Sequence, residues 1–262
     1  MINWLKYSFI LFLFWSCNNK LVKQYNSLSP EYKIIADSIL MKALDREGLY
    51  TVSGNIKPIS SIDLFQYVNS TTTKQTVLFS EIEKVQFVAN KLSTHKFSFI
   101  LNPFSRKDSN VVNLELYVVN NQLLMNTINE HQEFYHLLGI NKYVVPETVL
   151  AITEYESKYK RWRSYGYLFG YPDHAVDFFV NAGKIQDSSS VFVKRNFFQI
   201  PVFKYPSGYF TYALPLDYKP NAIDSSIYFK SINILNKYKY IRNKYFHKYR
   251  TPVKLFNKMI NQ

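Results

Sequence analysis

Two side chains suited to acid–base chemistry, His174 and Asp177, stand three residues apart in a largely apolar segment. Asp173 is of a type that begins helices and Gly183 of a type that ends them, so a buried helix is predicted between them. Residues three apart share a helix face, and a carboxylate beside an imidazole favours a charged pair. Such pairs serve general acid–base catalysis, but they also occur as structural hydrogen-bonded pairs. Both roles stay open.

A second polar element is the segment from residue 53 to residue 61, SGNIKPISS, which contains Lys57. Small polar residues with Gly and Pro predict a loop, and loops carried on rigid elements often hold ligand-binding groups. A plain turn is the alternative. If this loop and the predicted helix face one cleft, Lys57, His174 and Asp177 form a polar site that could serve a hydrolase.

Metal and phosphate chemistry find less support. His131 and His136 are five residues apart, about 140° around a helix, so they do not converge on one ion as a pair four apart would. Glu133 and His136 could share a face, yet a carboxylate-bridged metal site needs a second such motif, and a solvated helix face explains them as well. The seven glycines are too widely spaced for a phosphate-binding loop. The sequence therefore predicts no metal and no cofactor.

The first sixteen residues contain Lys6 and then an apolar run from Phe9 to Trp15. This run is far shorter than the about 20 residues that cross a bilayer, but it has the length of the apolar part of a secretion signal. The sole cysteine, Cys17, follows directly. The stretch FWSC at residues 14–17 resembles the processing site of a bacterial lipoprotein precursor. The alternative is a buried N-terminal helix with an incidental cysteine.

The resemblance implies that the signal is cleaved before Cys17 and that this residue carries fatty acyl chains such as palmitate. Because no Asp follows the cysteine, the resemblance also implies an outer-membrane location in the bacterial envelope. Two or three acyl chains would anchor the protein permanently, since each buried methylene contributes about 0.8 kcal/mol. No other segment approaches the length of a membrane span.

The chain is also basic, with 32 Lys and Arg against 19 Asp and Glu, and no acid follows Asp224. A helical C-terminal region is predicted with two different faces. One is apolar and aromatic, formed by Tyr238, Ile241, Tyr245 and Tyr249, and the other is cationic, formed by Lys237, Lys244 and Lys248. In an envelope protein such a face fits anionic headgroups better than nucleic acid, which is not expected as a partner. A solvated basic face is the alternative.

Hydrophobic periodicity and turn residues predict where the elements lie. The predicted helices are 30–47, 75–92, 121–138, 146–156, 158–168, 174–182 and a region from 221 onward. The predicted strands are 49–52, 97–101 paired with 111–119, and 197–203 paired with 209–215. Helices and antiparallel pairs without regular alternation indicate the α+β class.

These patterns predict a signal peptide at 1–16, a lipidated cysteine and tether at 17–29, and a single globular domain at 30–262. The leading functional hypothesis is an envelope lipoprotein whose domain binds a ligand or partner, without established catalysis. The alternatives are an envelope hydrolase that uses Lys57, His174 and Asp177, and a structural protein that contacts anionic headgroups.

Overall fold

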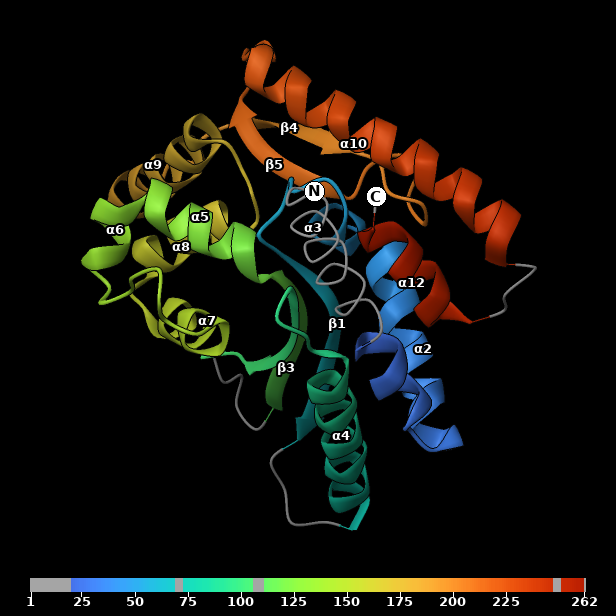
Figure 1. Ribbon diagram of the computed structural model, residues 1–262. Coiled ribbons are helices and arrows are strands. Elements are labelled where there is room, and N and C mark those ends of the chain that lie inside the picture. Colours follow the sequence, from blue (N-terminus) through green and yellow to red (C-terminus); the bar gives the residue numbers. More distant parts are fainter. Residues whose placement is uncertain (1–19, 69–72, 106–110, 247–250, 262) are drawn as a thin grey trace, which may run out of the picture.

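A computed structural model describes residues 20–68, 73–105, 111–246 and 251–261 of the chain (Figure 1). The α+β class is confirmed. The helices are α2 (Pro30–Asp45), α3 (Gly48–Val52), α4 (Thr73–Leu92), α5 (Asn121–Glu130), α6 (Gln132–His136), α7 (Pro146–Tyr155), α8 (Lys158–Leu168), α9 (Asp173–Ser189), α10 (Ala222–Ile241), the π turn η1 (Arg242–Phe246) and α12 (Pro252–Ile260). The strands are β1 (Ile59–Val68), β2 (Phe97–Pro103), β3 (Val111–Asn120), β4 (Arg195–Ile200) and β5 (Phe210–Pro215). Cys17 and Lys248 lie outside the described residues.

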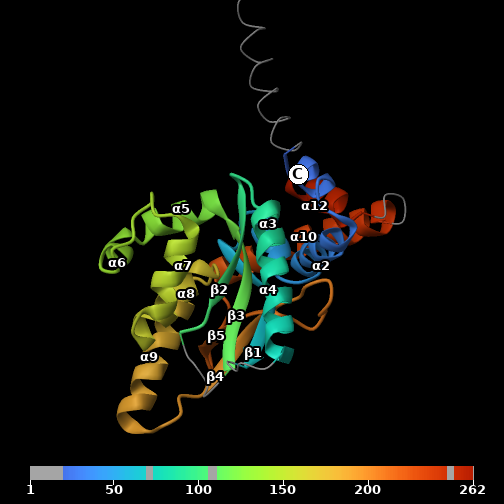
Figure 2. The ribbon, with the colours of Figure 1, turned by 90° about the horizontal axis from the view of Figure 1, so that it is seen from below.

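The three-stranded sheet has the order β1-β3-β2, with both neighbours antiparallel to the central strand. Side chains alternate between its faces, so Leu116 and Val118 enter one hydrophobic core while Tyr117 and Val119 enter another. The first core also contains residues of α2, α4, α10 and α12, and the second contains residues of α5 to α9. Both views place α4 on one side of this sheet and the α5–α8 group on the other (Figures 1 and 2).

The second sheet is the antiparallel hairpin of β4 and β5, which was predicted from residues 197–203 and 209–215. Helix α10 runs along its outer side (Figure 1). Asn221 caps α10, and Asp224 completes a reciprocal capping box with it. The hairpin joins the first core through Phe210, Tyr212 and Leu214. It therefore links α10 to the rest of the domain.

Two local predictions near Lys57 are wrong. The predicted strand 49–52 is part of the short helix α3, whose backbone carbonyl at Tyr50 accepts hydrogen bonds from the amides of Ile56 and Lys57. The predicted loop ends early, because Ile59 already pairs with Val119 and begins β1. The five residues of α3 contain too little periodicity to recognise, and β1 is decided by its pairing with β3, which a short window of sequence does not contain.

The segment predicted as a tether packs on the domain where it is described: residues 20–26 are helical, and Leu21, Tyr25 and Leu28 are buried in the first core.

Other differences concern helix ends. The predicted helix 121–138 is interrupted at His131, and α9 continues through Gly183 to Ser189. Gly183 faces α8 instead of ending the helix: a Cβ there would lie 2.4 Å from the Trp162 ring. The predicted C-terminal helical region is divided into α10, the π turn and α12. None of the helices within the described ranges is both long enough and apolar enough to span a membrane.

Candidate functional site

The site is built around Lys57, whose side chain is completely buried. Its ammonium donates a 2.6 Å hydrogen bond to Oε2 of Glu47, which begins the turn into α3. The same nitrogen lies 4.1 Å from the ring centre of Phe210, 5.2 Å from that of Phe169 and 5.8 Å from that of Tyr171. Burial lowers the pKa of Lys57, and the nearby Glu47 carboxylate opposes this shift. Lys57 is thus one half of an ion pair enclosed by aromatic rings.

Gly170 brings two of those rings to Lys57. It lies in the turn between α8 and α9 with a φ of 73°, and a Cβ there would stand 2.5 Å from the carbonyl oxygen of Ile56. Only glycine combines this left-handed conformation with such a close approach. The turn therefore packs directly on the loop that carries Lys57. Phe169 and Tyr171, the residues before and after Gly170, are thereby brought close to the Lys57 ammonium.

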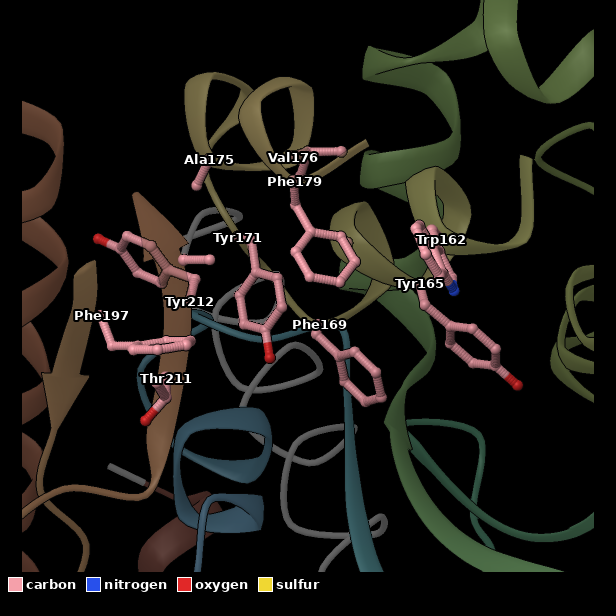
Figure 3. A pocket seen from close by; sticks show the side chains of 12 residues that line it. Trp162, Tyr165, Phe169, Tyr171, Ala175, Val176, Phe179, Phe197, Thr211 and Tyr212 are labelled. Carbon is pink, nitrogen blue, oxygen red and sulfur yellow. The ribbon is translucent and has the colours of Figure 1, made fainter. Parts of the chain in front are cut away.

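Beside these rings lies a pocket of about 300 Å³ between α8, α9 and the hairpin. Figure 3 shows Phe169, Tyr171 and Phe179 near its centre, Trp162 and Tyr165 on the α8 side, and Phe197, Thr211 and Tyr212 on the hairpin side. The lining residues are mostly aromatic, and none is charged: Trp162, Tyr165, Gly166, Phe169, Tyr171, Ala175, Val176, Phe179, Phe197, Thr211, Tyr212 and Ala213. A preformed, largely apolar pocket of this size is typical of small-molecule sites.

Three polar groups of the lining have no hydrogen-bond partner among the described residues: the Tyr171 hydroxyl, the Thr211 hydroxyl and the Trp162 indole N–H. The other two tyrosines of the lining are engaged elsewhere. Tyr165 donates to Glu154 at 2.6 Å, and Tyr212 donates to Asp224 at 2.7 Å. The Tyr212 hydroxyl points away from the central rings in Figure 3. The Thr211 oxygen and the Trp162 nitrogen are also turned away from the central rings, so the surface of the pocket is mainly apolar (Figure 3).

The structure gives the three residues of the predicted polar site three different partners. Lys57 pairs with Glu47, His174 lies 3.1 Å from Asp224, and Asp177 pairs with Arg163 at 2.6 Å. The Asp177 side chain is 53% exposed, which differs from the predicted dry environment. A catalytic role for Lys57, His174 and Asp177 stays a prediction.

The carboxylate beside His174 belongs to Asp224, which the sequence analysis did not identify as its partner. Asp224 is fully buried and accepts hydrogen bonds from Tyr212, Tyr218 and the backbone amide of Asn221, in addition to its contact with His174. Burial raises the pKa of Asp224, but these donors and the His174 charge outweigh it, so the pKa lies below its ordinary value. Asp224 is therefore a charged anchor that holds α9, β5 and α10 together.

The helix face with His131 carries no metal cluster, since no group of three suitable ligands exists among the described residues. His131 instead stacks on Tyr167 with ring centres 3.7 Å apart, and it lies 3.7 Å from Asp173. Asp173 is the first residue of α9 and does not cap it with its side chain.

The cationic face predicted at the C-terminus is partly described. Lys237 and Lys244 are exposed, whereas Tyr238 and Ile241 are buried as predicted. The side chain of Tyr245 and the whole of Tyr249 and Lys248 lie outside the described residues. Two aromatic side chains that were not singled out, Phe229 and Tyr240, are also exposed on α10, at 64% and 62%. By helical spacing they lie on the same side of α10 as Lys237, and Lys244 of η1 donates a 3.2 Å hydrogen bond to the Tyr240 hydroxyl.

The sequence analysis also did not identify Glu47 or the aromatic lining. The only sequence signal for the lining was the cluster of rings around Gly166 and Gly170, which periodicity alone assigns to a buried core. Comparison of the sequence with protein-family models, with curated proteins and with solved structures finds no significant match in any of the three.

Proposed function

We propose that this chain is a bacterial envelope lipoprotein, anchored through Cys17, whose domain binds a small and largely apolar ligand in the aromatic pocket. The observation that carries the binding proposal is the pocket itself, because seven of its twelve lining residues are aromatic and none is charged. Rings bring a large apolar surface and prefer stacked or edge-on contact with another flat group. The pocket is thus suited to a ligand with an aromatic or compact apolar body.

The size of the pocket limits the ligand. At the roughly 30 Å³ that a water molecule occupies in the liquid, 300 Å³ holds about ten non-hydrogen atoms. Tyr171 and Thr211 can each donate or accept one hydrogen bond, and Trp162 can only donate. A ligand of this size with one or two acceptor atoms would satisfy them. This proposal needs no catalytic step.

Trp162 provides the test, because the chain has only three tryptophans and the other two, Trp4 and Trp15, precede Cys17. In the full chain with Trp4→Phe and Trp15→Phe, indole emission reports on the pocket alone. We expect 4-phenylbutanamide, a neutral probe of suitable size, to change this emission saturably. Thr211→Phe should abolish the change by filling the pocket, and aromatic residues are well tolerated in strands.

Thr211→Val is the matched control, because it removes the hydroxyl but keeps the volume and the β-branched shape. It should retain saturable binding, weakened at most by the loss of one hydrogen bond. Thermal unfolding of each variant checks that the fold is intact. Binding to folded Thr211→Phe with the affinity of the parent protein would exclude this pocket as the site.

A second surface, on α10, supports a contact with anionic headgroups. By helical spacing Phe229, Lys237 and Tyr240 share one side of α10, and Lys244 of η1 donates a 3.2 Å hydrogen bond to the Tyr240 hydroxyl. The only acid in α10, Asp224, is buried. Exposed rings beside lysines suit a membrane interface, where each nearby cation contributes about 1 kcal/mol toward an anionic surface.

We expect the double variant Lys237→Glu and Lys244→Glu to lose most of the protein's binding to vesicles that contain phosphatidylglycerol, measured by co-sedimentation of the unlipidated Cys17→Ala protein. Binding should also weaken at 1 M salt, where the Debye length is about 3 Å. Lys142→Glu with Lys184→Glu is the control with the same charge change on exposed residues away from α10. If both double variants lose the same amount, net charge and not this surface is responsible.

A further inference from the structure

Several of the rings that line the pocket also lie close to protein cations. Lys57 lies over Phe169 and Tyr171, Lys158 lies 4.9 Å from the Trp162 ring centre, and Arg195 lies 5.7 Å from the Phe179 ring centre. A cation over an aromatic face is attracted by the negative charge of that face. These rings therefore already interact with protein cations, so they attract a cationic ligand less strongly.

Most of the charges around the pocket are paired. Lys57 pairs with Glu47, Lys158 with Asp187 at 2.5 Å, and Arg161 lies 3.7 Å from Glu154. Asp224 contacts His174 and accepts hydrogen bonds from three donors, one of which is the Tyr212 hydroxyl.

Arg195 differs from these cations. Among the described residues no carboxylate lies within 4 Å of it, and its one hydrogen bond goes from Nε to the carbonyl oxygen of Val193. Its guanidinium lies against the rings of Phe179 and Phe192, so it is held in place by packing. A guanidinium that has no acid partner keeps donors for an anion.

The strand register places Arg195 at the end of the pocket wall. Arg195 and Phe197 are two residues apart on β4 and share one face of the hairpin, and Phe197 pairs with Ala213 on β5. Phe197 and Ala213 line the pocket. From Phe197 the wall continues to Arg195, about 7 Å further along the strand. A pocket with an apolar wall and a guanidinium at its edge is suited to an amphiphilic ligand.

We propose that the ligand carries one anionic group, which Arg195 binds at the edge of the pocket while the apolar body lies among the rings. The ligand class is an aryl or short alkyl carboxylate of about ten non-hydrogen atoms. This inference rests on the proposed function, because it assigns the chemistry of the same pocket. A carboxylate would accept charge-assisted hydrogen bonds from the guanidinium, with the two groups in the planar arrangement that arginine favours.

Three probes with one apolar body test the head group: 4-phenylbutanoate, 4-phenylbutanamide and 4-phenylbutylammonium. Each is titrated at fixed ionic strength into the full chain with Trp162 as its only tryptophan. We expect the carboxylate to bind about tenfold more tightly than the amide, and the ammonium to bind more weakly than either. Arg195→Gln should remove the preference for the carboxylate over the amide, because the lost charge weakens carboxylate binding far more than amide binding.

Two further variants separate a specific contact from general charge. Lys194→Gln removes the same charge from the adjacent, exposed residue and should keep the tenfold preference, and Arg195→Lys should keep part of it. Equal binding of carboxylate and amide to the parent protein would overturn the anionic head group but leave the pocket proposal standing. Equal loss of preference in Lys194→Gln, or an unchanged preference in Arg195→Gln, would also overturn it. If no probe binds, the proposed function itself fails.

Discussion

Replacing Glu47 by alanine should lower the free energy of unfolding by about 3–5 kcal/mol, since it leaves the Lys57 ammonium buried without an acceptor. Such a loss is a large part of the 5–15 kcal/mol that typically stabilises a domain. The rings around Lys57 attract the ammonium, but cation–π contacts contribute only about 2 kcal/mol each even when dry. Urea unfolding at constant slope measures the change as a shift of the midpoint.

Two comparisons show that burial of the charge is the cause. The double variant Glu47→Met with Lys57→Met should recover most of the lost stability, because an apolar pair of similar volume needs no desolvation of charge. Asp63→Ala breaks the more exposed ion pair with Lys42 and should cost no more than about 1 kcal/mol. A Glu47→Ala protein within 1 kcal/mol of the parent would contradict a charged, buried Lys57.

The pH dependence of the Glu47→Ala protein gives an independent check of the same prediction. The pKa of Lys57 is lowered in the folded protein by burial, so between that pKa and 10.5 the unfolded chain binds more protons than the folded one. The contribution of Lys57 to stability therefore rises with pH in this interval. Without Glu47 the folded pKa falls further, and the rise should begin at a lower pH than in the parent protein.

Replacing Cys17 by alanine should move most of the protein from the membrane fraction to the soluble fraction of the envelope. Acylation should be lost completely because Cys17 is the only cysteine, so no second thiol can take over. Two or three acyl chains would bind a membrane far more strongly than any surface contact of the domain. For the same reason, incorporation of labelled palmitate into the parent protein reports on this residue alone and should vanish in Cys17→Ala.

Ser16→Ala is the matched control, because alanine keeps a small residue before the cysteine and should allow normal processing. Intact mass shows whether residues 1–16 have been removed and whether acyl chains have been added. A mature protein that retains these residues and an unmodified thiol would exclude the lipoprotein hypothesis.

Local sequence patterns were sufficient for most elements of the fold. The hairpin of β2 and β3 follows from alternating residues around a polar turn, and α4, α7 and α8 follow from helical periodicity. Strand β1 was missed because its polar residues Ser60, Ser61 and Asp63 hide the alternation until β3 is placed beside it. Helix α3 was missed because a five-residue helix contains too little periodicity to recognise.

The candidate site was harder to predict than the fold for a physical reason. Lys57 was singled out, but its partner Glu47 is ten residues away, across a helical turn that the sequence did not reveal. His174 was paired with Asp177 by helical spacing, whereas its actual neighbour Asp224 is fifty residues away. Periodicity finds residues on one helix face and cannot find partners that meet only when separate elements pack. The aromatic pocket arises in that same way.

Asp224 also connects two surfaces that have been treated separately. One of its oxygens holds the Tyr212 hydroxyl in the wall of the pocket, and the other accepts the backbone amide of Asn221 at the cap of α10. The carboxylate is rigid and only about 2 Å wide between its oxygens. Asp224 therefore joins the first turn of α10 to the pocket wall, in addition to the ring contact between Tyr228 of α10 and Phe198 of β4. A shift of the first turn of α10 would consequently also move the ring of Tyr212.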